Sequence, residues 1–197
     1  MKNSKNQSKK EIFKAIRKAN LKEILLDENN INSSIYSEKI KTFKEALKKA
    51  GGKSFEIQKE QIAKKISKLF GNDKKIISYI DDIKDNIIEK KDIEKAYDLK
   101  DIDVAVVQGD MGIAENGAVW CNDKNIPFRA IFFIVKTLVV VIKKENILNN
   151  MQEAYENIDI NLSNFGVFIS GPSKTADIEQ SLVIGAHGAV EHFVFLV

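Results

Sequence analysis

The sequence predicts an α/β protein in which a mixed, mostly parallel sheet is sandwiched by helices, with further helices appended at the N-terminus. Three observations favour this fold class. The first half carries amphipathic helical patterns, the second half carries short β-branched runs punctuated by glycines, and helical stretches separate the last of these runs. Strands that alternate with helices are typical of a covered sheet. The Asn116-Gly117 pair signals a hairpin, so at least one strand pair is antiparallel.

The first half is predicted to be mainly helical. Ile40, Phe43 and Leu47 share one helical stripe, and that helix ends at Gly51-Gly52. A short strand at 53–57 (KSFEI), an amphipathic helix at 59–71, a strand at 74–80 (KKIISYI) and a mostly helical stretch at 81–98 follow. We expect one domain over residues 1–197, with a helical N-terminal part over 1–52 and an α/β core over 53–197.

The second half is predicted to supply most of the sheet. The run at 130–144 is the most apolar, and it favours a buried strand pair or one long strand; it is too short to cross a bilayer as a helix. Helices are expected at 146–159 and 175–185. The strand candidates are DVAVVQ (103–108), GAVWC (117–121), TLVVVI (137–142), FGVFIS (165–170) and HFVFLV (192–197).

Cysteine usage limits the chemistry of this chain. Cys121 is the single cysteine, so the chain can form no intrachain disulfide and can hold no iron–sulfur cluster or cysteine-based zinc site by itself. This favours a reducing compartment, and we expect a cytoplasmic protein with no membrane span. The polar start of the chain lacks the apolar core of an export signal.

The charge is distributed unevenly along the chain. Residues 1–100 carry 25 Lys and Arg against 16 Asp and Glu, whereas residues 101–197 carry 6 against 12. The lysines of the first half alternate with acidic residues at helical spacing and are not interleaved with aromatic residues. We therefore expect a solvated helix face, on which an acidic protein partner could dock, and no nucleic-acid binding.

The stretch ISGPSKTADIEQSLVIGAHG (169–188) is the main functional candidate. A strand, a sharp Gly171-Pro172 turn and a helix would place free backbone N–H groups at a helix start, where anions bind. Ser173 and Thr175 add hydroxyl donors and Lys174 adds a positive charge. The alternative is that Ser173, Thr175 or Asp177 simply caps the helix. A phosphate, a carboxylate or a cofactor phosphate would suit the first reading.

Two further side chains are candidates for acid–base or nucleophilic chemistry. His187 lies between glycines in GAHG, where a neutral imidazole can serve in proton transfer or can simply bond the loop. Glu115 directly precedes the Asn-Gly turn among small residues, and it is either a base or nucleophile or an exposed hairpin residue. Asp110 could line the same pocket or cap a turn. We expect Trp120 and Cys121 in the core, and His192 to be structural or partly exposed.

These motifs resemble the LUD-domain family of lactate-utilization proteins. GPSKTADIE (171–179) differs from the family's Gly-Pro-Ser-Arg-Thr-Ala-Asp-Ile-Glu only at Lys174, and GAHG matches its Gly-x-His-Gly. IAENG (113–117) is similar to its Ile-Ala-Glu-Thr-Gly, and Arg129 stands where the family often has an arginine. The resemblance covers about residues 101–197. It departs at Lys174, Asn116 and Ala189, the last replacing a proline.

The resemblance implies a fold like that of sugar-phosphate isomerases and class I CoA transferases. It also implies a role in oxidising lactate to pyruvate beside iron–sulfur oxidoreductase proteins, with a small anionic ligand at the Glu115 and Gly171–Asp177 loops. AENG further resembles the Ser-Glu-Asn-Gly element of the transferases, whose Glu attacks an acyl-CoA. Three hypotheses follow: a binding component of lactate oxidation, a transferase- or isomerase-like enzyme using Glu115, or a non-catalytic assembly subunit. The sequence identifies no cofactor.

Overall fold

The structure, a computed structural model, describes residues 11–15, 34–71, 73–80, 93–159, 163–175, 183–185 and 188–197. The chain divides into two compact units, residues 1–32 and 33–197. In the first, residues 11–15 are helical, with Ile12 and Phe13 more than half exposed. All features below belong to the second unit. Within the described residues, no helix is both long enough and apolar enough to cross a membrane.

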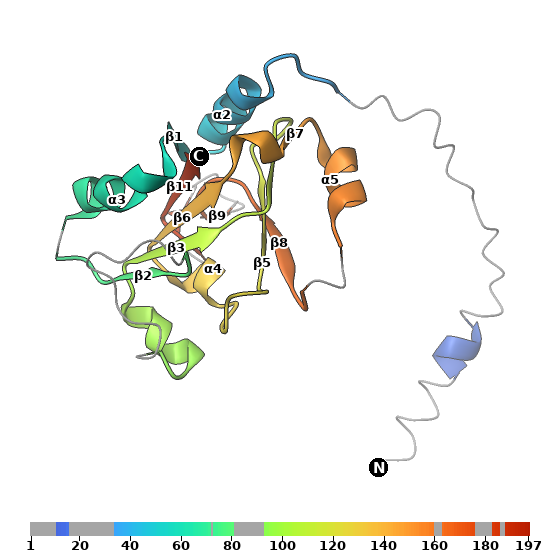
Figure 1. Cartoon of the computed structure of the whole chain (residues 1–197). Helices are drawn as coiled ribbons and strands as arrows, with labels where there is room; N and C mark the ends of the chain where they lie inside the picture. Colours follow the sequence, from blue (N-terminus) through green and yellow to red (C-terminus); the bar gives the residue numbers. More distant parts are fainter. Residues whose placement is uncertain are drawn as a thin grey trace, which may run out of the picture. The chain divides into compact units, whose positions relative to one another are not determined.

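A five-stranded parallel sheet forms the centre of the second unit (Figure 1). Its strand order is β1-β11-β6-β3-β2, and every neighbouring pair is parallel. The central strand β6 is buried along its whole length, as expected for a β-branched strand covered on both faces. The strands are β1 (Lys53–Glu56), β2 (Ile76–Ser78), β3 (Val104–Gln108), β6 (Thr137–Ile142) and β11 (Glu191–Leu196).

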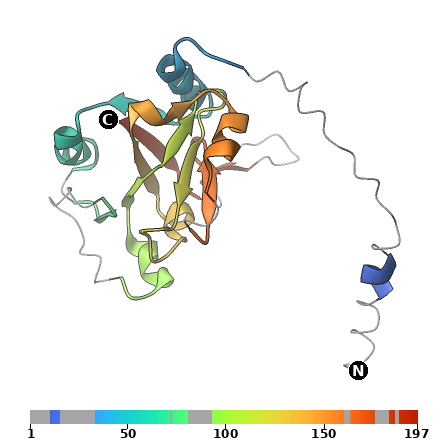
Figure 2. The same cartoon turned by 45° about the vertical axis from the view of Figure 1, so that its right-hand side comes forward.

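A second, four-stranded sheet lies beside the first (Figure 2). Its order is β7-β4-β5-β8; β4 pairs with β5 and β5 with β8 in antiparallel fashion, whereas β4 and β7 are parallel. The mixed strand pairing expected from the Asn116-Gly117 hairpin is confirmed, and the antiparallel β4–β5 pair that this hairpin joins lies in this separate sheet. The strands are β4 (Met111–Ile113), β5 (Val119–Asn122), β7 (Ile147–Leu148) and β8 (Gly166–Ile169).

Alternate residues of β6 point into two different cores, so the central sheet is covered on both faces. Val139 and Val141 pack with Ile62 and Ile66 of α3, while Leu138, Val140 and Ile142 pack with residues of α2, α4 and the second sheet. The predicted covered α/β sheet is thus confirmed. The helices are α2 (Lys39–Lys49), α3 (Ile62–Phe70), α4 (Ile131–Ile134) and α5 (Met151–Asn157), with 3-10 turns η2 (Lys59–Gln61), η4 (Ala96–Asp101) and η5 (Lys144–Asn146).

Two predicted elements differ in the structure. The apolar run at 130–144 is neither a strand pair nor one long strand, because α4 occupies its first part and β6 begins only at Thr137. The partners β3 and β11 supply only five and six residues, which limits the length over which β6 can pair. Ile131 and Phe132 of α4 are buried, whereas Phe133 and Ile134 are exposed.

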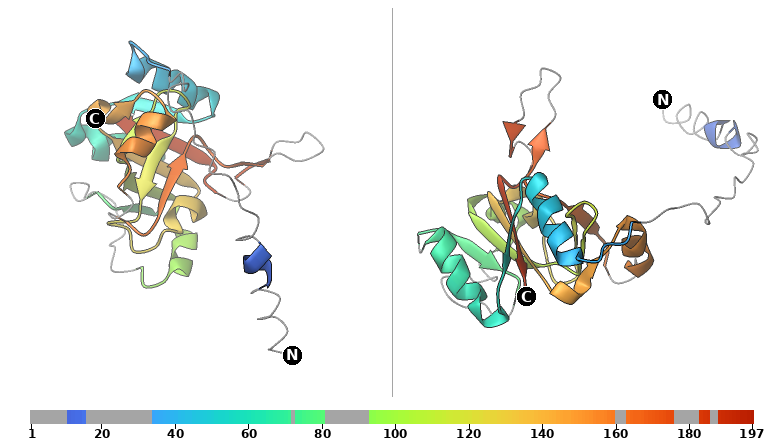
Figure 3. Two further views of the ribbon diagram at one scale, coloured as in Figure 1. Left: turned by 90° about the vertical axis from the view of Figure 1, so that its right-hand side faces the viewer. Right: turned by 90° about the horizontal axis from the view of Figure 1, so that it is seen from above.

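The helix expected over 175–185 is wrong at both ends. β9 (Lys174–Thr175) and β10 (Val183–Ile184) instead pair as antiparallel strands, which project from the body of this unit (Figure 3). The backbone groups of β9 bond to those of β10, whereas in a helix they would bond to groups four residues along the chain. Residues 176–182 lie outside the described residues, as does most of the predicted helix at 81–98.

Candidate functional site

Glu115 lies in the β4–β5 turn, and its carboxylate holds the start of α5. Glu115 Oε2 accepts a 3.0 Å hydrogen bond from the Met151 backbone N–H, the first residue of that helix. The Glu115 N–H in turn donates to the Asn149 carbonyl at 3.0 Å. The side chain is exposed. Its position therefore already has a structural use, namely joining the hairpin to α5.

The tip of this hairpin meets the Gly171-Pro172 turn. Ser170 Oγ donates a 2.9 Å hydrogen bond to the Asn116 carbonyl, so the two sequence motifs are in direct contact. Gly117 and Gly171 both have positive φ, 68° and 73°. A Cβ at Gly117 would lie 2.3 Å from the Leu47 nitrogen, and a Cβ at Gly171 would lie 2.2 Å from the Ala50 oxygen. Both turns thus require glycine because they pack against the end of α2.

The two ends of the segment 171–189 are fastened to each other at Ser173. The Ser173 N–H donates to the Ala189 carbonyl at 2.8 Å, and the Ser173 carbonyl accepts from the Gly185 N–H at 2.9 Å. An ideal Cβ on Gly188 would lie only 3.0 Å from the Ser173 Cβ. The Gly-Pro-Ser turn and the returning Gly188–Ala189 stretch therefore lie side by side before β11.

His192, the second residue of β11, is buried beneath this turn with an exposed fraction of 1%. Its Nδ1 accepts a 3.1 Å hydrogen bond from the Gly171 N–H, while Nε2 is buried and has no hydrogen-bond partner among the described residues. Burial lowers the pKa of His192 to about 4, so the ring is neutral at pH 7. Because Nδ1 acts as an acceptor, the single ring proton resides on Nε2, which is a hydrogen-bond donor.

His192 lines a cavity of about 230 Å³ that brings together both ends of the predicted functional stretch. Gly171, Pro172 and Ser173 contribute from the start of this stretch, and Gly188 and Ala189 from its end. The rest of the wall is mainly apolar and aromatic. No charged side chain is found among the described residues that line it. Such a cavity can hold a small molecule. Its apolar wall includes Phe132, Phe133, Leu138, Val167 and Ile169.

Arg129 and Lys174 stand close to this cavity without lining it. The Arg129 guanidinium carbon lies 5.6 Å from the centre of the Phe165 ring. That ring packs against Phe132 and Phe133, which belong to the cavity wall, at centroid distances of 6.2 and 6.3 Å. Lys174 is exposed and directly follows Ser173. Two positive charges thus lie near an uncharged cavity, where they can attract an anion.

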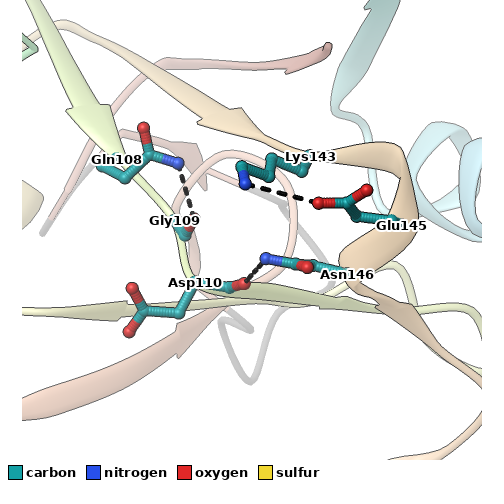
Figure 4. Close-up of polar contacts among 6 residues, drawn as sticks. All are labelled: Gln108, Gly109, Asp110, Lys143, Glu145 and Asn146. Atoms are coloured by element: carbon teal, nitrogen blue, oxygen red, sulfur yellow. Dashed lines mark hydrogen bonds and ion pairs between the residues drawn. The ribbon is translucent and has the colours of Figure 1, made fainter.

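Asp110 lies apart from these residues, because it precedes β4 whereas Glu115 follows it. Its carboxylate accepts a hydrogen bond from the Asn122 side chain, and its carbonyl accepts one from Asn146 Nδ2 at 2.7 Å (Figure 4). Desolvation by the surrounding protein raises the pKa of the Asp110 carboxyl, although the side chain remains accessible. The structure therefore does not bring Asp110 and Glu115 into one pocket.

The carboxyl ends of β3 and β6 carry the other polar residues of Figure 4. Ligands of open parallel sheets usually bind beyond such ends. Here Gln108 Nε2 donates to the Gly109 and Val141 carbonyls, both at 2.9 Å, and Lys143 pairs with Glu145 at 3.3 Å. The Gln108 amide is thus bonded to the backbone, and Lys143 forms an ion pair with Glu145.

Of the remaining predicted site residues, Thr175 lies in β9, and Asp177 and His187 fall outside the described residues. The helix start that would have bound an anion through backbone N–H groups is replaced at Lys174–Thr175 by a strand. Of the two alternatives expected for His192, structural or partly exposed, the structure agrees with the first, since the ring is buried and accepts a hydrogen bond from the Gly171 N–H. A signal for it exists in the sequence: HFVFLV places an ionisable ring in an otherwise apolar strand.

Comparisons with known proteins agree with this architecture. The family model of the LUD domain matches residues 79–197. Lactate utilization protein C from Geobacillus kaustophilus is 34% identical over 94 residues, which are 45% of this chain and 39% of that protein. The proteins of the same name from Shouchella clausii and Bacillus subtilis are 33% identical over 112 residues and 30% over 115, covering 54% and 55% of this chain and 48% and 46% of those proteins. The matched segments thus span less than half of each relative.

A solved structure supports the fold. A DUF162-family protein from Deinococcus radiodurans aligns with a TM-score of 0.63 at 14% identity, covering 83% of this chain and 99% of that one. At this identity the likeness concerns the fold alone. The family match, in contrast, extends over more than half of the sequence, from Tyr79 in the loop after β2 to the last residue. The chain therefore belongs to the LUD-domain family.

Proposed function

We propose that this chain is a component of lactate utilization that binds a small anionic ligand at the Gly171–Lys174 segment. The relatives named lactate utilization protein C support the role, and the family's motif lies in the matched region. Lactate and pyruvate are the small anions that such a role involves.

The observation that carries the ligand-binding part is the convergence at one cavity. Gly171 and Ser173 from the start of the motif and Gly188 from its end line the same space. Lys174 and Arg129 add positive charge nearby, and neither forms an ion pair within the described part of the chain. Attraction of an anion toward an uncharged cavity by nearby cations is a physically consistent arrangement.

Electron transfer in this role requires partner proteins, and we propose iron–sulfur oxidoreductases. Oxidation of lactate to pyruvate releases two electrons and two protons. With a single cysteine, this chain cannot by itself bind an iron–sulfur cluster that would accept the electrons. Its single thiol, Cys121, is fully buried, and burial strongly raises its pKa. The proposed division of labour is binding by this chain and electron transfer by its partners, in the cytoplasm.

The surroundings of Glu115 support a covalent role for it less well than they support the binding-component hypothesis. Its carboxylate accepts a hydrogen bond from the Met151 N–H, and an attack on an acyl-CoA would have to break that contact. The engaged carboxylate favours the binding-component hypothesis over the transferase-like one. In that hypothesis Glu115 supports the start of α5, and its neighbour Asn116 accepts the hydrogen bond from Ser170.

A growth experiment tests the proposed role. A strain from which the gene has been deleted should lose growth on L-lactate and keep normal growth on pyruvate, because only the oxidation step is removed. A plasmid copy of the gene should restore growth on lactate. Normal growth of the deletion strain on L-lactate as sole carbon source would refute the role.

A further inference from the structure

A hollow of about 450 Å³ between α2 and the start of β1 is lined mainly by lysines. Those of α2 recur every three or four residues and so share one stripe of the helix. Three of the four form ion pairs, at 2.7, 2.8 and 3.1 Å, with glutamates that do not line the hollow. Among the described residues of the lining, Glu45 is the one acidic side chain, so the hollow is positively charged. The lysines of this lysine hollow are Lys41, Lys44, Lys48 and Lys53.

The lysine hollow ends beside the Gly-Pro-Ser turn. Gly52 lines the hollow, and a Cβ on its neighbour Gly51 would lie 3.3 Å from Pro172 Cδ and 3.6 Å from Lys174 Cε. Figure 3 shows the end of α2 beside the base of the β9–β10 hairpin. Lys48 and Lys174 are both exposed, and neither forms an ion pair within the described part of the chain. The positive charge of the hollow thus continues to the segment at which we propose anion binding.

The backbone at the end of α2 does not add donors for a small anion. The C-terminus of a helix carries partial negative charge, and α2 ends at the hollow. The N–H groups of Ala50, Gly51 and Gly52 all donate to carbonyls of the last turns of α2, at 2.9 to 3.0 Å. Small phosphate sites in proteins use free N–H groups at a helix N-terminus instead. The lysine side chains therefore suit a larger anionic surface that they contact at several points.

The lining of the hollow favours an acidic protein over a nucleic acid. No aromatic side chain is found among the described residues that line it, so unpaired bases would have no ring on which to stack. Glu45 lies in the hollow, and Glu38 and Glu56 lie beside it, each paired with a lysine of α2. These carboxylates would repel a continuous phosphate backbone. A protein surface, in contrast, can present acidic groups to the lysines and neutral groups to the glutamates.

We propose that the lysine hollow and Lys174 form a docking surface for an acidic segment of the iron–sulfur oxidoreductase partner. The identity of the partner rests on the proposed function, whereas the place and the charge of the docking surface rest on the lysines of α2 and β1. Complementary charges speed association and fix orientation, and salt weakens them. A partner docked here lies next to the Gly171–Lys174 segment, at which we propose that the ligand binds.

Two matched pairs of substitutions in the full chain test the surface. Lys44→Gln with Lys48→Gln removes two charges from the hollow. Lys64→Gln with Lys68→Gln removes two charges at the same spacing from α3, which packs on the other face of the central sheet. Glutamine is a good helix former, so both variants should keep their helices. The probes are fluorescent poly-L-glutamate and an oligothymidylate of equal charge.

We expect the affinity for poly-L-glutamate to fall at least fivefold in the α2 variant and less than twofold in the α3 variant, and to decrease with added salt. Equal losses in the two variants contradict the proposal. So does a wild-type protein that does not bind poly-L-glutamate, or one that binds oligothymidylate more tightly. Because the wild-type measurements need no substitution, a misfolded variant does not remove the test.

Photo-crosslinking in cells identifies the partner without changing a lysine. A benzophenone amino acid replaces Glu45 in the lysine hollow or, as the control, Glu60 in η2, which is also exposed. In lactate-grown cells we expect an adduct from position 45 only, with an iron–sulfur protein whose crosslinked peptide carries net negative charge. No adduct from position 45, equal adducts from both positions, or a positively charged peptide overturns the proposal.

The result is separable from the lactate role. If the crosslinked peptide is acidic but its protein holds no iron–sulfur cluster, the docking surface stands and the partner class given in the proposed function is refuted. If the deletion strain fails on lactate while no adduct forms from position 45, the role stands and this inference is overturned.

Discussion

As the pH is lowered, this protein should begin to lose stability at a higher pH than titration of its carboxylates alone would cause, because of His192. Burial lowers the pKa of His192 from an ordinary 6.5 to about 4. Between these two pH values the unfolded chain binds a proton that the folded chain does not, so stability falls as the pH falls through this window. At roughly 1.4 kcal/mol per pH unit, the loss amounts to about 3 kcal/mol at pH 4 relative to pH 7.

Other groups move stability in the same direction but at lower pH. Hydrogen bonds from Lys44 and Lys136 lower the pKa values of Glu56 and Asp103, and those from Asn149 lower the pKa of Glu153. Their stabilising effect is present above the ordinary carboxyl pKa and is lost as the pH falls below it. The His192 effect starts near pH 6.5, where these carboxylates are still ionised in both states.

Urea unfolding of wild type and His192→Gln at half-unit steps from pH 7.5 to 4 isolates the histidine. Glutamine does not titrate, so the carboxylate effects cancel in the difference between the two proteins. The free energy of unfolding of wild type should decrease by about 3 kcal/mol relative to the variant, mostly between pH 6.5 and 4. A difference that is independent of pH would show that His192 protonates equally in both states and is not buried as described.

Three further outcomes follow from the packing. Gly117→Ala should lower the free energy of unfolding by more than about 2 kcal/mol in thermal unfolding, because its Cβ would meet the Leu47 backbone and its φ is positive; a loss below about 1 kcal/mol would contradict this packing. Glu115→Ala should lower the free energy of unfolding by about 1 kcal/mol, and Glu115→Gln should lower it less, because the glutamine amide oxygen can still accept the hydrogen bond from the Met151 N–H. An acyl-CoA adduct detected on the wild-type protein by mass spectrometry would instead support Glu115 as a nucleophile. Cys121 should react with a thiol reagent only as fast as the protein unfolds, and rapid reaction of folded protein would contradict its burial.

The fold was largely predictable because the strands of the central sheet are continuous β-branched runs. TLVVVI and DVAVVQ correspond closely to β6 and β3, and GAVWC and FGVFIS cover β5 and β8. Their assignment to two sheets was not predictable, since it depends on which runs pair at long range. The turn at 131–134 was missed for a similar reason, as an apolar run has no periodicity that separates a buried helical turn from a strand.

The candidate site was predicted in part. The sequence predicts Gly171, Ser173 and the glycine-rich GAHG as site candidates, and the structure gathers Gly171, Ser173 and Gly188 around one cavity. The predicted anion site at backbone N–H groups depended on a helix start near Thr175, and the structure has the strand β9 there instead. The buried donor of His192 could not be inferred, since its tautomer depends on a hydrogen bond from a residue 21 positions earlier.

The IAENG hairpin and the Gly-Pro-Ser turn are distant in the sequence and meet beside this cavity. His192 and Leu138 pair in register as the second residues of β11 and β6, so the cavity lies at the amino ends of these parallel strands. Ligands of parallel sheets more often bind at the opposite ends, where the connecting loops supply donors. At the amino ends, polar groups must come from elsewhere, and here the turn after β8 contributes Ser170 and Ser173 to the cavity wall. That turn is held by Ser170 bonding to Asn116 at the hairpin tip, and by Gly171 bonding to His192. The IAENG hairpin thus contributes to the site by fixing the Gly-Pro-Ser turn, which gives Asn116 and Gly117 a role that needs no reaction at Glu115.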